Sequence, residues 1–350
     1  PACEKPDSAD CAGEDCAKSF VLENCPETCG TCIIAVDTTA PPTTTTKTAT
    51  AVIEKYPGST SNYVPQGSVT AADGAGGTIE LRWHLDQLRP TLKATLAGYP
   101  GSTAIPPTGT VAVEDQPDGS IKVFYDMAGL ADGAASGGLH IHTGTSCDDA
   151  AQVGGHYWSD QAIPDPWSTA YTVGSDGAAK GSFQLTSGYT FDGNDGHVVV
   201  VHDDAGARVA CGVLNTASGG VHIHTGTSCA DADTVGGHYW TPTSAADPWT
   251  TTYTSGATTT KGVAVVASGY QFAGNVNHAV VVHSAADGSR IGCGVLKAAA
   301  GLHIHTGTTC SNASKVGGHY WNADTAGDAD PWNSVAVAVA SDGSAKGTVE

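Results

Sequence analysis

The chain has 350 residues, 40% of them hydrophobic, and its 35 acidic and 15 basic residues give a formal net charge of −20. A chain of this length divides into several modules, and its acidic excess repels a phosphate backbone, so we exclude nucleic acid as a partner. No apolar stretch approaches the roughly 20 residues of a membrane-spanning helix, so we expect no membrane span. Glycine occurs 45 times and Val, Thr and Ala dominate the apolar runs, which favours strands and turns, so the expected fold class is mainly β.

Residues 1–34 form a cysteine-rich segment that is too short to build a core without disulfides. Three disulfides among its six cysteines are the expected staples. The spacing ends in Cys25-Pro-Glu-Thr-Cys29-Gly-Thr-Cys32 and resembles that of ShK-like domains, which implies a small interaction module of a secreted protein. Two interpretations stay open, a disulfide-stapled cap and a module that binds a target. The six cysteines are Cys3, Cys11, Cys16, Cys25, Cys29 and Cys32.

Residues 35–66 are rich in Thr and Pro, and we expect them to form a linker that buries no core. Such tracts commonly carry O-linked glycans, expected here on Thr43, Thr44, Thr45 and Thr46. Asn312 begins an N-glycosylation sequon, Asn-Ala-Ser. The chain starts at Pro1 without an initiator Met or a signal peptide, so we expect a processed product. With the cysteines, these features indicate an oxidising compartment and a protein that is secreted or held at the cell surface.

A short motif is duplicated after the linker. Tyr56-Pro-Gly-Ser-Thr and Tyr99-Pro-Gly-Ser-Thr each precede a Gly-x-Val strand start, a turn and a second strand, so that Gly67–Leu88 aligns with Gly109–Leu130. Each copy predicts a β-hairpin. We assign residues 67–98 to the first hairpin segment and include the second in the module that follows.

From Gly138 onward a longer unit occurs three times, at periods of 82 and 81 residues. Each copy begins with His-Ile-His-Thr-Gly-Thr and continues through Val-Gly-Gly-His-Tyr-Trp and Asp-Pro-Trp into a predicted hairpin. The first two copies end in a Val-rich strand, a histidine and Cys-Gly-Val-Leu, whereas the third stops inside its hairpin at Glu350. We expect modules at residues 99–216 and 217–298 and an incomplete module at residues 299–350.

The histidines of each copy form a set that suits a metal ion. Two histidines at i and i+2 on a strand project from the same face, so His140 and His142 are expected to be neighbours. His156 after a glycine turn and His202 at a strand end would complete four imidazoles, which suit copper. One such histidine alone is more simply a hydrogen-bonded residue, but the recurrence of the set favours metal binding. The matching residues are His222, His224, His238 and His283 in the second copy and His303, His305 and His319 in the third.

These motifs resemble those of copper/zinc superoxide dismutase over residues 109–350. The resemblance implies tandem β-sandwich modules with Greek-key, immunoglobulin-like topology, each holding copper on its four histidines. It also implies a disulfide from a loop cysteine to the cysteine of Cys-Gly-Val, and an arginine three residues before that cysteine that guides the substrate. The residues in these places are Cys147 with Cys211, Cys229 with Cys293, the unmatched Cys310, and the arginines Arg208 and Arg290.

Two features depart from that family. No histidine lies between His156 and His197, so the histidines of the family's zinc site are missing and we expect no zinc. His197 and His278 lie at an odd offset from the strand-end histidine and are expected on the opposite face. The aspartate of Asp-Pro-Trp either accepts a hydrogen bond from the loop histidine or is a turn residue beside a packed Trp. These aspartates are Asp165, Asp247 and Asp330.

The second departure is the length of the repeat. About five strands fit into it, whereas a superoxide dismutase barrel has eight, and unpaired sheet edges invite pairing with other strands. We therefore expect the repeats to share strands with a neighbouring repeat or with another chain. Gly67–Leu88 is a candidate donor.

Three hypotheses of function remain open. In the first, the chain is a secreted copper-binding repeat protein, similar to superoxide dismutase, that self-associates through shared strands in an extracellular or cell-surface assembly. The second is a copper-only superoxide dismutase, an extracellular antioxidant acting on superoxide or another small oxidant. A third is a glycosylated structural filament subunit with relict metal sites, since open-ended contacts between identical subunits give filaments. The arginines favour the enzyme and the charge of −20 opposes it, so enzymatic activity stays undecided.

Overall fold

The computed structural model describes residues 47–130, 136–159, 163–241, 246–298, 300–301, 304–310, 315–322 and 336–337. Over these residues the protein is mainly β, as expected, with four five-stranded antiparallel sheets and one two-stranded sheet. Its described helices are single turns, and none of them is long and apolar enough to cross a membrane. The cysteine-rich segment 1–34, Thr43–Thr46, His303, Asn312 and Asp330 lie outside the described residues.

Two sheets enclose one core between residues 91 and 216, and we call this body the inserted sandwich. One sheet has the order β11-β8-β7-β5-β14 and the other the order β10-β9-β12-β13-β6. Residues such as Val113, Met127 and Ile141 fill the space between them. The elements are β5 (Thr91–Thr95), β6 (Ala97–Gly98), β7 (Thr108–Asp115), β8 (Ile121–Ala128), β9 (Ser136–His142), α2 (Ala150–Val153), β10 (Ala170–Thr172), β11 (Ala179–Leu185), η2 (Phe191–Asn194), β12 (Val198–His202), β13 (Arg208–Val213) and β14 (Asn215–Thr216).

The other two sheets enclose a second core, and their strands come from both sides of the inserted sandwich in the sequence. We call this body the split sandwich. Its sheets have the orders β17-β4-β3-β1-β20 and β16-β15-β18-β19-β2. The elements are β1 (Thr48–Val52), β2 (Glu54–Lys55), β3 (Gln66–Asp73), η1 (Ala75–Gly77), β4 (Ile79–Asp86), β15 (Ser218–His224), α3 (Ala232–Val235), β16 (Thr252–Thr254), β17 (Thr260–Val266), α4 (Phe272–Asn275), β18 (Ala279–His283), β19 (Arg290–Val295) and β20 (Lys297–Ala298).

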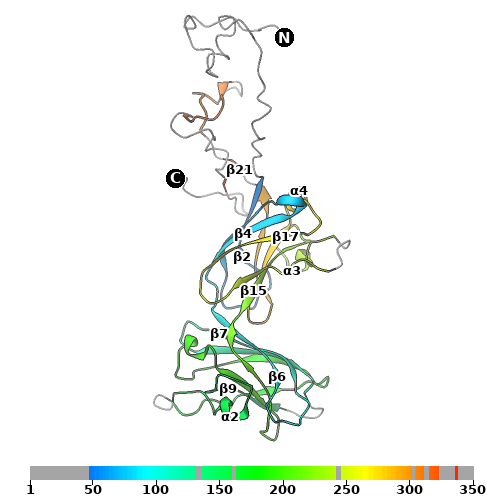
Figure 1. Ribbon diagram of the computed structural model, residues 1–350. Helices are drawn as coiled ribbons and strands as arrows, with labels where there is room; N and C mark the ends of the chain where they lie inside the picture. Colours follow the sequence, from blue (N-terminus) through cyan, green and yellow to red (C-terminus); the bar gives the residue numbers. More distant parts are fainter. Residues whose placement is uncertain are drawn as a thin grey trace, which may run out of the picture. The chain divides into compact units, whose positions relative to one another are not determined.

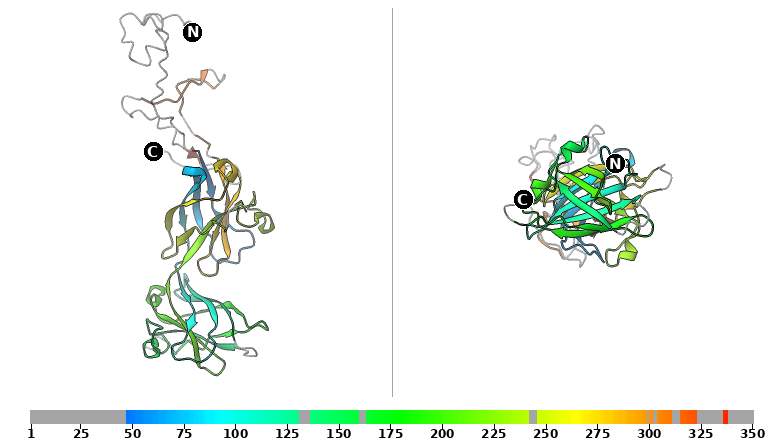
Figure 2. Two further views of the ribbon diagram at one scale, coloured as in Figure 1. Left: turned by 45° about the vertical axis from the view of Figure 1, so that its right-hand side comes forward. Right: turned by 90° about the horizontal axis from the view of Figure 1, so that it is seen from below.

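Strand sharing therefore takes place within the chain. The second repeat supplies five principal strands, β15 to β19, and the segment Thr48–Asp86 supplies β1, β3 and β4. Cyan β4 lies beside yellow β17 in Figure 1, and the left view of Figure 2 shows the same blue and yellow-to-orange segments in one body. Residues 48–66, expected to belong to a linker, and residues 67–86 thus form one sandwich with residues 217–298, because neither part can bury its apolar face alone. Residues 91–98 of the predicted hairpin segment instead form β5 and β6 of the inserted sandwich.

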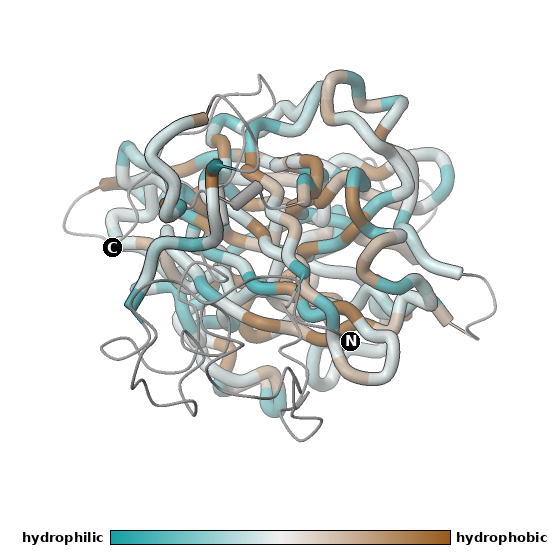
Figure 3. Tube along the Cα trace, turned by 90° about the horizontal axis from the view of Figure 1, so that it is seen from above, coloured by the Kyte–Doolittle hydropathy of each residue, from teal (hydrophilic) through white to brown (hydrophobic). Residues whose placement is uncertain are grey.

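The burial of side chains follows the strand period. Ile79, Leu81, Trp83 and Leu85 of β4 are buried while the residues between them are not, so one face of this strand points into the core. In β12 all four valines are buried, because its second face is covered by Val153 of α2 and by Cys211. Figure 3 shows the resulting mixture of apolar and polar segments along the trace.

In the described part of the third repeat, large apolar side chains are more exposed than their counterparts in the first two repeats. Ile304 is 57% exposed, whereas the matching Ile141 and Ile223 are 1% and 0% exposed. Tyr320 is likewise 65% exposed. The short strands β21 (Ala300–Gly301) and β22 (Ala336–Val337) pair with each other.

Candidate metal centres

Four histidine rings converge beside β9 of the inserted sandwich. His140 and His142 flank the buried Ile141 and so lie on the opposite face of the strand from the core. An isolated β-bridge joins His142 to His156. The His140 ring centroid lies 4.4 Å from that of His156 and 4.8 Å from that of His202. The strand period and one loop bridge thus bring together the four residues that the sequence predicts as ligands.

Hydrogen bonds leave one ring nitrogen of three of these histidines available. The Nδ1 atoms of His142 and His202 lie 3.0 Å from the carbonyl oxygens of Gly154 and Gly206. His156 Nδ1 lies 2.8 Å from a carboxylate oxygen of Asp165. Because these oxygens only accept hydrogen bonds from the rings, each Nδ1 carries the proton and each Nε2 presents its lone pair. The Nε2 atoms of His142 and His202 are 3.5 Å apart.

His140 differs from these three histidines, because its available nitrogen is Nδ1. Its Nδ1 is buried without a hydrogen-bond partner, and in the split sandwich the matching His222 donates from Nε2 to the Thr251 carbonyl at 3.1 Å and leaves Nδ1 in the same state. A buried, unpartnered nitrogen is costly unless something binds it. A Cβ on Gly138 would meet the His140 ring at 2.7 Å, which explains the glycine before each His-x-His.

Burial keeps the histidines of each His-x-His pair neutral. Burial is the largest cause that lowers the pKa of His140 to about 4 and that of His142 to about 3. The corresponding values for His222 and His224 are about 4 and about 3, for the same reason. Unprotonated nitrogens are what a metal ion requires. The two strand histidines of each cluster are therefore ready to coordinate at neutral pH.

The split sandwich repeats the arrangement. One ring nitrogen each of His222, His224, His238 and His283 lies within 4.8 Å of the other three. In the inserted sandwich His140, His142 and His156 meet that limit, and His202 joins them through its approach to His142. Both clusters could hold a metal ion.

The Asp-Pro-Trp aspartate has two partners at once. Asp165 accepts from His156 and, through its other oxygen, from the Trp167 backbone N–H at 2.9 Å. Burial alone would raise the pKa of Asp165, but these hydrogen bonds lower it below its usual value. Asp247 contacts His238 in the same way at 2.6 Å. Asp165 thus holds the turn before Trp167 and also orients His156, so both interpretations of this aspartate apply.

An arginine lies beside each cluster. Arg208 donates at 2.7 Å to the Gly154 carbonyl, the same oxygen that accepts from His142. Arg290 contacts the Gly236 carbonyl at 2.7 Å in the split sandwich. Gly154 has a φ of +73°, a conformation that favours glycine and that aims this carbonyl at both groups.

Two tyrosines complete the surroundings of the arginines. Arg208 donates to the Tyr99 hydroxyl and Arg290 to the Tyr56 hydroxyl, both at 2.9 Å. Neither tyrosine is among the residues that the sequence predicts for the site. The signal that could have found them is the duplicated Tyr-Pro-Gly-Ser-Thr motif.

Disulfides tie the histidine loops to the sheets. The structure forms Cys147–Cys211 and Cys229–Cys293, with Cα–Cα distances of 6.2 and 5.9 Å. Cys310 is exposed and unpaired.

The other described histidines of the repeats are two that the sequence places outside the site and two of the third repeat. His197 stacks on Tyr157 at 3.9 Å and stays outside the cluster, as His278 does on Tyr239 at 3.7 Å. In the third repeat the ring centroids of His305 and His319 are 5.1 Å apart. That pair matches His142 and His156 of the first repeat.

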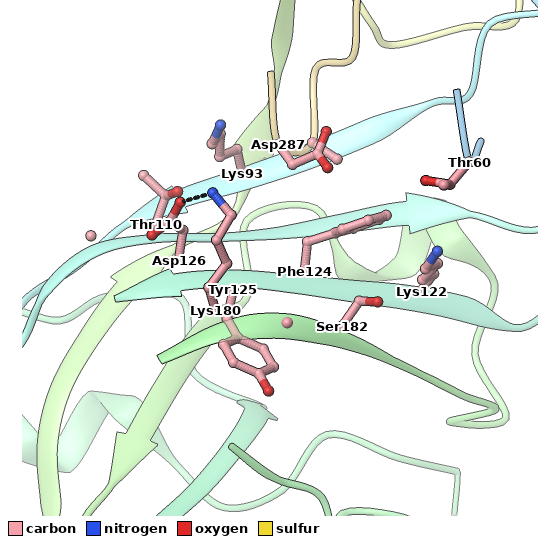
Figure 4. Close-up of a pocket in the computed structure, with 13 residues that line it drawn as sticks. Thr60, Lys93, Thr110, Lys122, Phe124, Tyr125, Asp126, Lys180, Ser182 and Asp287 are labelled. Atoms are coloured by element: carbon pink, nitrogen blue, oxygen red, sulfur yellow. Dashed lines mark hydrogen bonds and ion pairs between the residues drawn. The ribbon is translucent and has the colours of Figure 1, made fainter. Parts of the chain in front are cut away.

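A pocket apart from the histidines is lined by residues of β8 and β11 together with Thr60 and Asp287 of the split sandwich (Figure 4). Lys180 Nζ is ion-paired with Asp126 at 2.6 Å, and Lys122 Nζ lies 4.7 Å from the Phe124 ring centroid. These cations already contact side chains of their own sheet, so we assign the pocket no function.

A scan against protein-family models and a search of curated proteins find no match to this chain.

Proposed function

We propose that the chain is a secreted copper-binding protein of the superoxide dismutase type, with one copper ion in each sandwich. The observation that carries the proposal is the set of available nitrogens, three Nε2 atoms and one buried, unpartnered Nδ1, which recurs in both sandwiches. Imidazole nitrogens suit copper(II) in a tetragonal arrangement. The two disulfides fit an oxidising compartment.

A second site for zinc beside each copper site is the alternative arrangement, and the residues present argue against it. A second metal on the far side of His156 would need its Nδ1, but that atom is engaged with Asp165. No histidine between His156 and His197 could replace the missing ligands. The site is therefore suited to a single metal ion with only nitrogen ligands.

Superoxide disproportionation is the activity that we propose for the centres. Bound copper would supply the one-electron chemistry that this reaction needs. Arg208 contributes a fixed positive charge beside His142, and local charge steers an anion even when the net charge of −20 opposes it. Asp165 holds His156 in the tautomer that presents Nε2.

The test is copper stoichiometry together with superoxide decay on the full chain. We expect two copper ions per chain, one after His156→Ala and none after the additional His238→Ala change, with decay falling in parallel. His84→Ala is the matched control, because His84 lies on β4 outside both clusters. Unchanged copper content in the double variant would overturn the assignment. Copper binding without accelerated decay would overturn only the activity.

A second function, assembly, is supported by the third repeat. Ile304 and Tyr320 are exposed there, and the split sandwich illustrates how a distant three-stranded segment completes a repeat. We propose that strands of a neighbouring chain cover this face in an extracellular assembly. Electron microscopy and light scattering of the native protein test it. Monodisperse single chains at high concentration would contradict it.

A further inference from the structure

The Tyr-Pro-Gly-Ser-Thr motif has the same structure in both sandwiches. The Ser59 N–H donates to the Tyr56 carbonyl at 3.0 Å, and Ser102 contacts Tyr99 in the same way. The glycine inside each turn has a φ of +78°, which is what a turn with Pro second and Gly third requires. The motif therefore forms a fixed turn whose first residue is a tyrosine.

Backbone pairing places each tyrosine next to its arginine. The Tyr99 N–H donates to the carbonyl of Val209, the neighbour of Arg208, at 3.1 Å. The Tyr56 N–H donates to the carbonyl of Ile291, the neighbour of Arg290, at 3.0 Å. The contact of Tyr56 with Ile291 joins residues on either side of the inserted sandwich in the sequence. Each histidine centre thus receives its tyrosine from a different segment, but the tyrosine pairs with the same position of the arginine strand.

The guanidinium of each arginine is held at two points. In both sandwiches one terminal nitrogen contacts a tyrosine hydroxyl at 2.9 Å and the other a glycine carbonyl at 2.7 Å. The guanidinium carbon also lies 5.6 Å from the tyrosine ring centroid. The Tyr56 hydroxyl donates in turn to the Ala232 carbonyl at 3.2 Å, which orients its lone pairs toward the arginine. Agreement between two copies with different surrounding sequence indicates that the contact is part of the site.

We propose that Tyr56 and Tyr99 are positioning residues that hold Arg290 and Arg208 for the binding of a small anion at the histidine centres. The inference rests on the proposed copper function. A phenol accepts the hydrogen bond without neutralising the guanidinium, whereas a carboxylate in its place would cancel the charge that attracts the anion. Fixing the long arginine side chain in advance removes the entropy cost of ordering it when the anion arrives.

The test measures azide binding to the copper-loaded full chain in a His238→Ala background, which leaves only the centre of the inserted sandwich. Tyr99→Phe should raise the azide dissociation constant about threefold to tenfold, read from the copper charge-transfer band, with copper content unchanged. Tyr125→Phe in β8, where the tyrosine packs against the core of the inserted sandwich, is the matched control and should have no effect. In an Arg208→Ala background, Tyr99→Phe should cause no further loss, because the tyrosine acts through the arginine.

The outcomes separate this inference from the proposed function. An azide affinity within twofold of the parent, or an equal loss in the Arg208→Ala background, overturns the positioning role while copper binding stands. Loss of copper in Tyr99→Phe shows a structural role and also overturns it. Absence of copper from the unmodified chain overturns the proposed function and the inference together.

Discussion

Leu81→Ala in β4 tests whether residues 48–86 and 218–298 form one cooperative sandwich. The Leu81 side chain is fully buried in a core that also contains Val221 and Val280 of the second repeat. Replacing a buried leucine by alanine costs about 2–5 kcal/mol, from lost burial and from the cavity that remains. A loss of about 3 kcal/mol speeds amide exchange roughly a hundredfold wherever exchange follows unfolding of the sandwich.

Hydrogen exchange of the native chain, resolved by peptides, provides the assay. We expect faster exchange in β15 and β18, more than 130 residues away in the sequence, and unchanged exchange in β9 and β12. Leu92→Ala in β5, also a buried leucine, is the matched control and should give the reverse pattern. Faster exchange confined to β3 and β4, or spread equally over both sandwiches, would refute the division into an inserted and a split sandwich.

Three further predictions follow from particular contacts. Asp165→Asn should weaken copper binding at the inserted centre about 10–100-fold, measured by chelator competition with the split centre as internal reference; equal affinity at both centres would contradict the role of the carboxylate. Cys147→Ser with Cys211→Ser opens a bond between residues 64 apart and should cost about 4 kcal/mol in denaturant unfolding, whereas a loss below 1 kcal/mol would show that the loop is held otherwise. A fragment of residues 89–217 should unfold cooperatively by circular dichroism, while residues 218–298 alone should not; a folded second fragment would show that the repeat needs no added strands.

Much of the histidine site could be predicted because its signals are local. The i, i+2 spacing of His140 and His142 fixes their common face, and the recurrence of His156 and His202 in the next copy marks them as part of the same set. The choice between Nδ1 and Nε2 could not be predicted, because it depends on carbonyls such as that of Gly154, which a glycine with positive φ aims at the ring. The contact of Asp165 with His156 also depends on how the loop folds, so the sequence left it as one of two interpretations.

A local sequence pattern does not predict which strands join which sandwich. The hairpins that contain β4 and β8 have similar alternation and turns, so either could cover either repeat. Tyr56 and Tyr99 could not be assigned to the site from their motif, because the tyrosine reaches the arginine only when the strand before it pairs with β19 or β13. Non-local pairing thus decided both the fold and the part of the site that the sequence did not reveal.

The inserted sandwich is built from one continuous stretch of the chain, and this gives a physical reason why the segment with β4 pairs with the second repeat. Its strands from β5 to β14 need no residue outside 91–216, and its formation brings the chain ends together, since Ala217 N–H donates to the Thr91 carbonyl at 2.8 Å. Closing residues 87–217 as a free loop would cost about 3 kcal/mol more than closing a loop of a few residues, because the entropy grows with the logarithm of length. Once the inserted sandwich is folded, β4 and the second repeat are effectively neighbours. The third repeat gains no such advantage from either sandwich, since both three-stranded segments within residues 47–130 are already paired, and this is why we propose that strands of a neighbouring chain complete it.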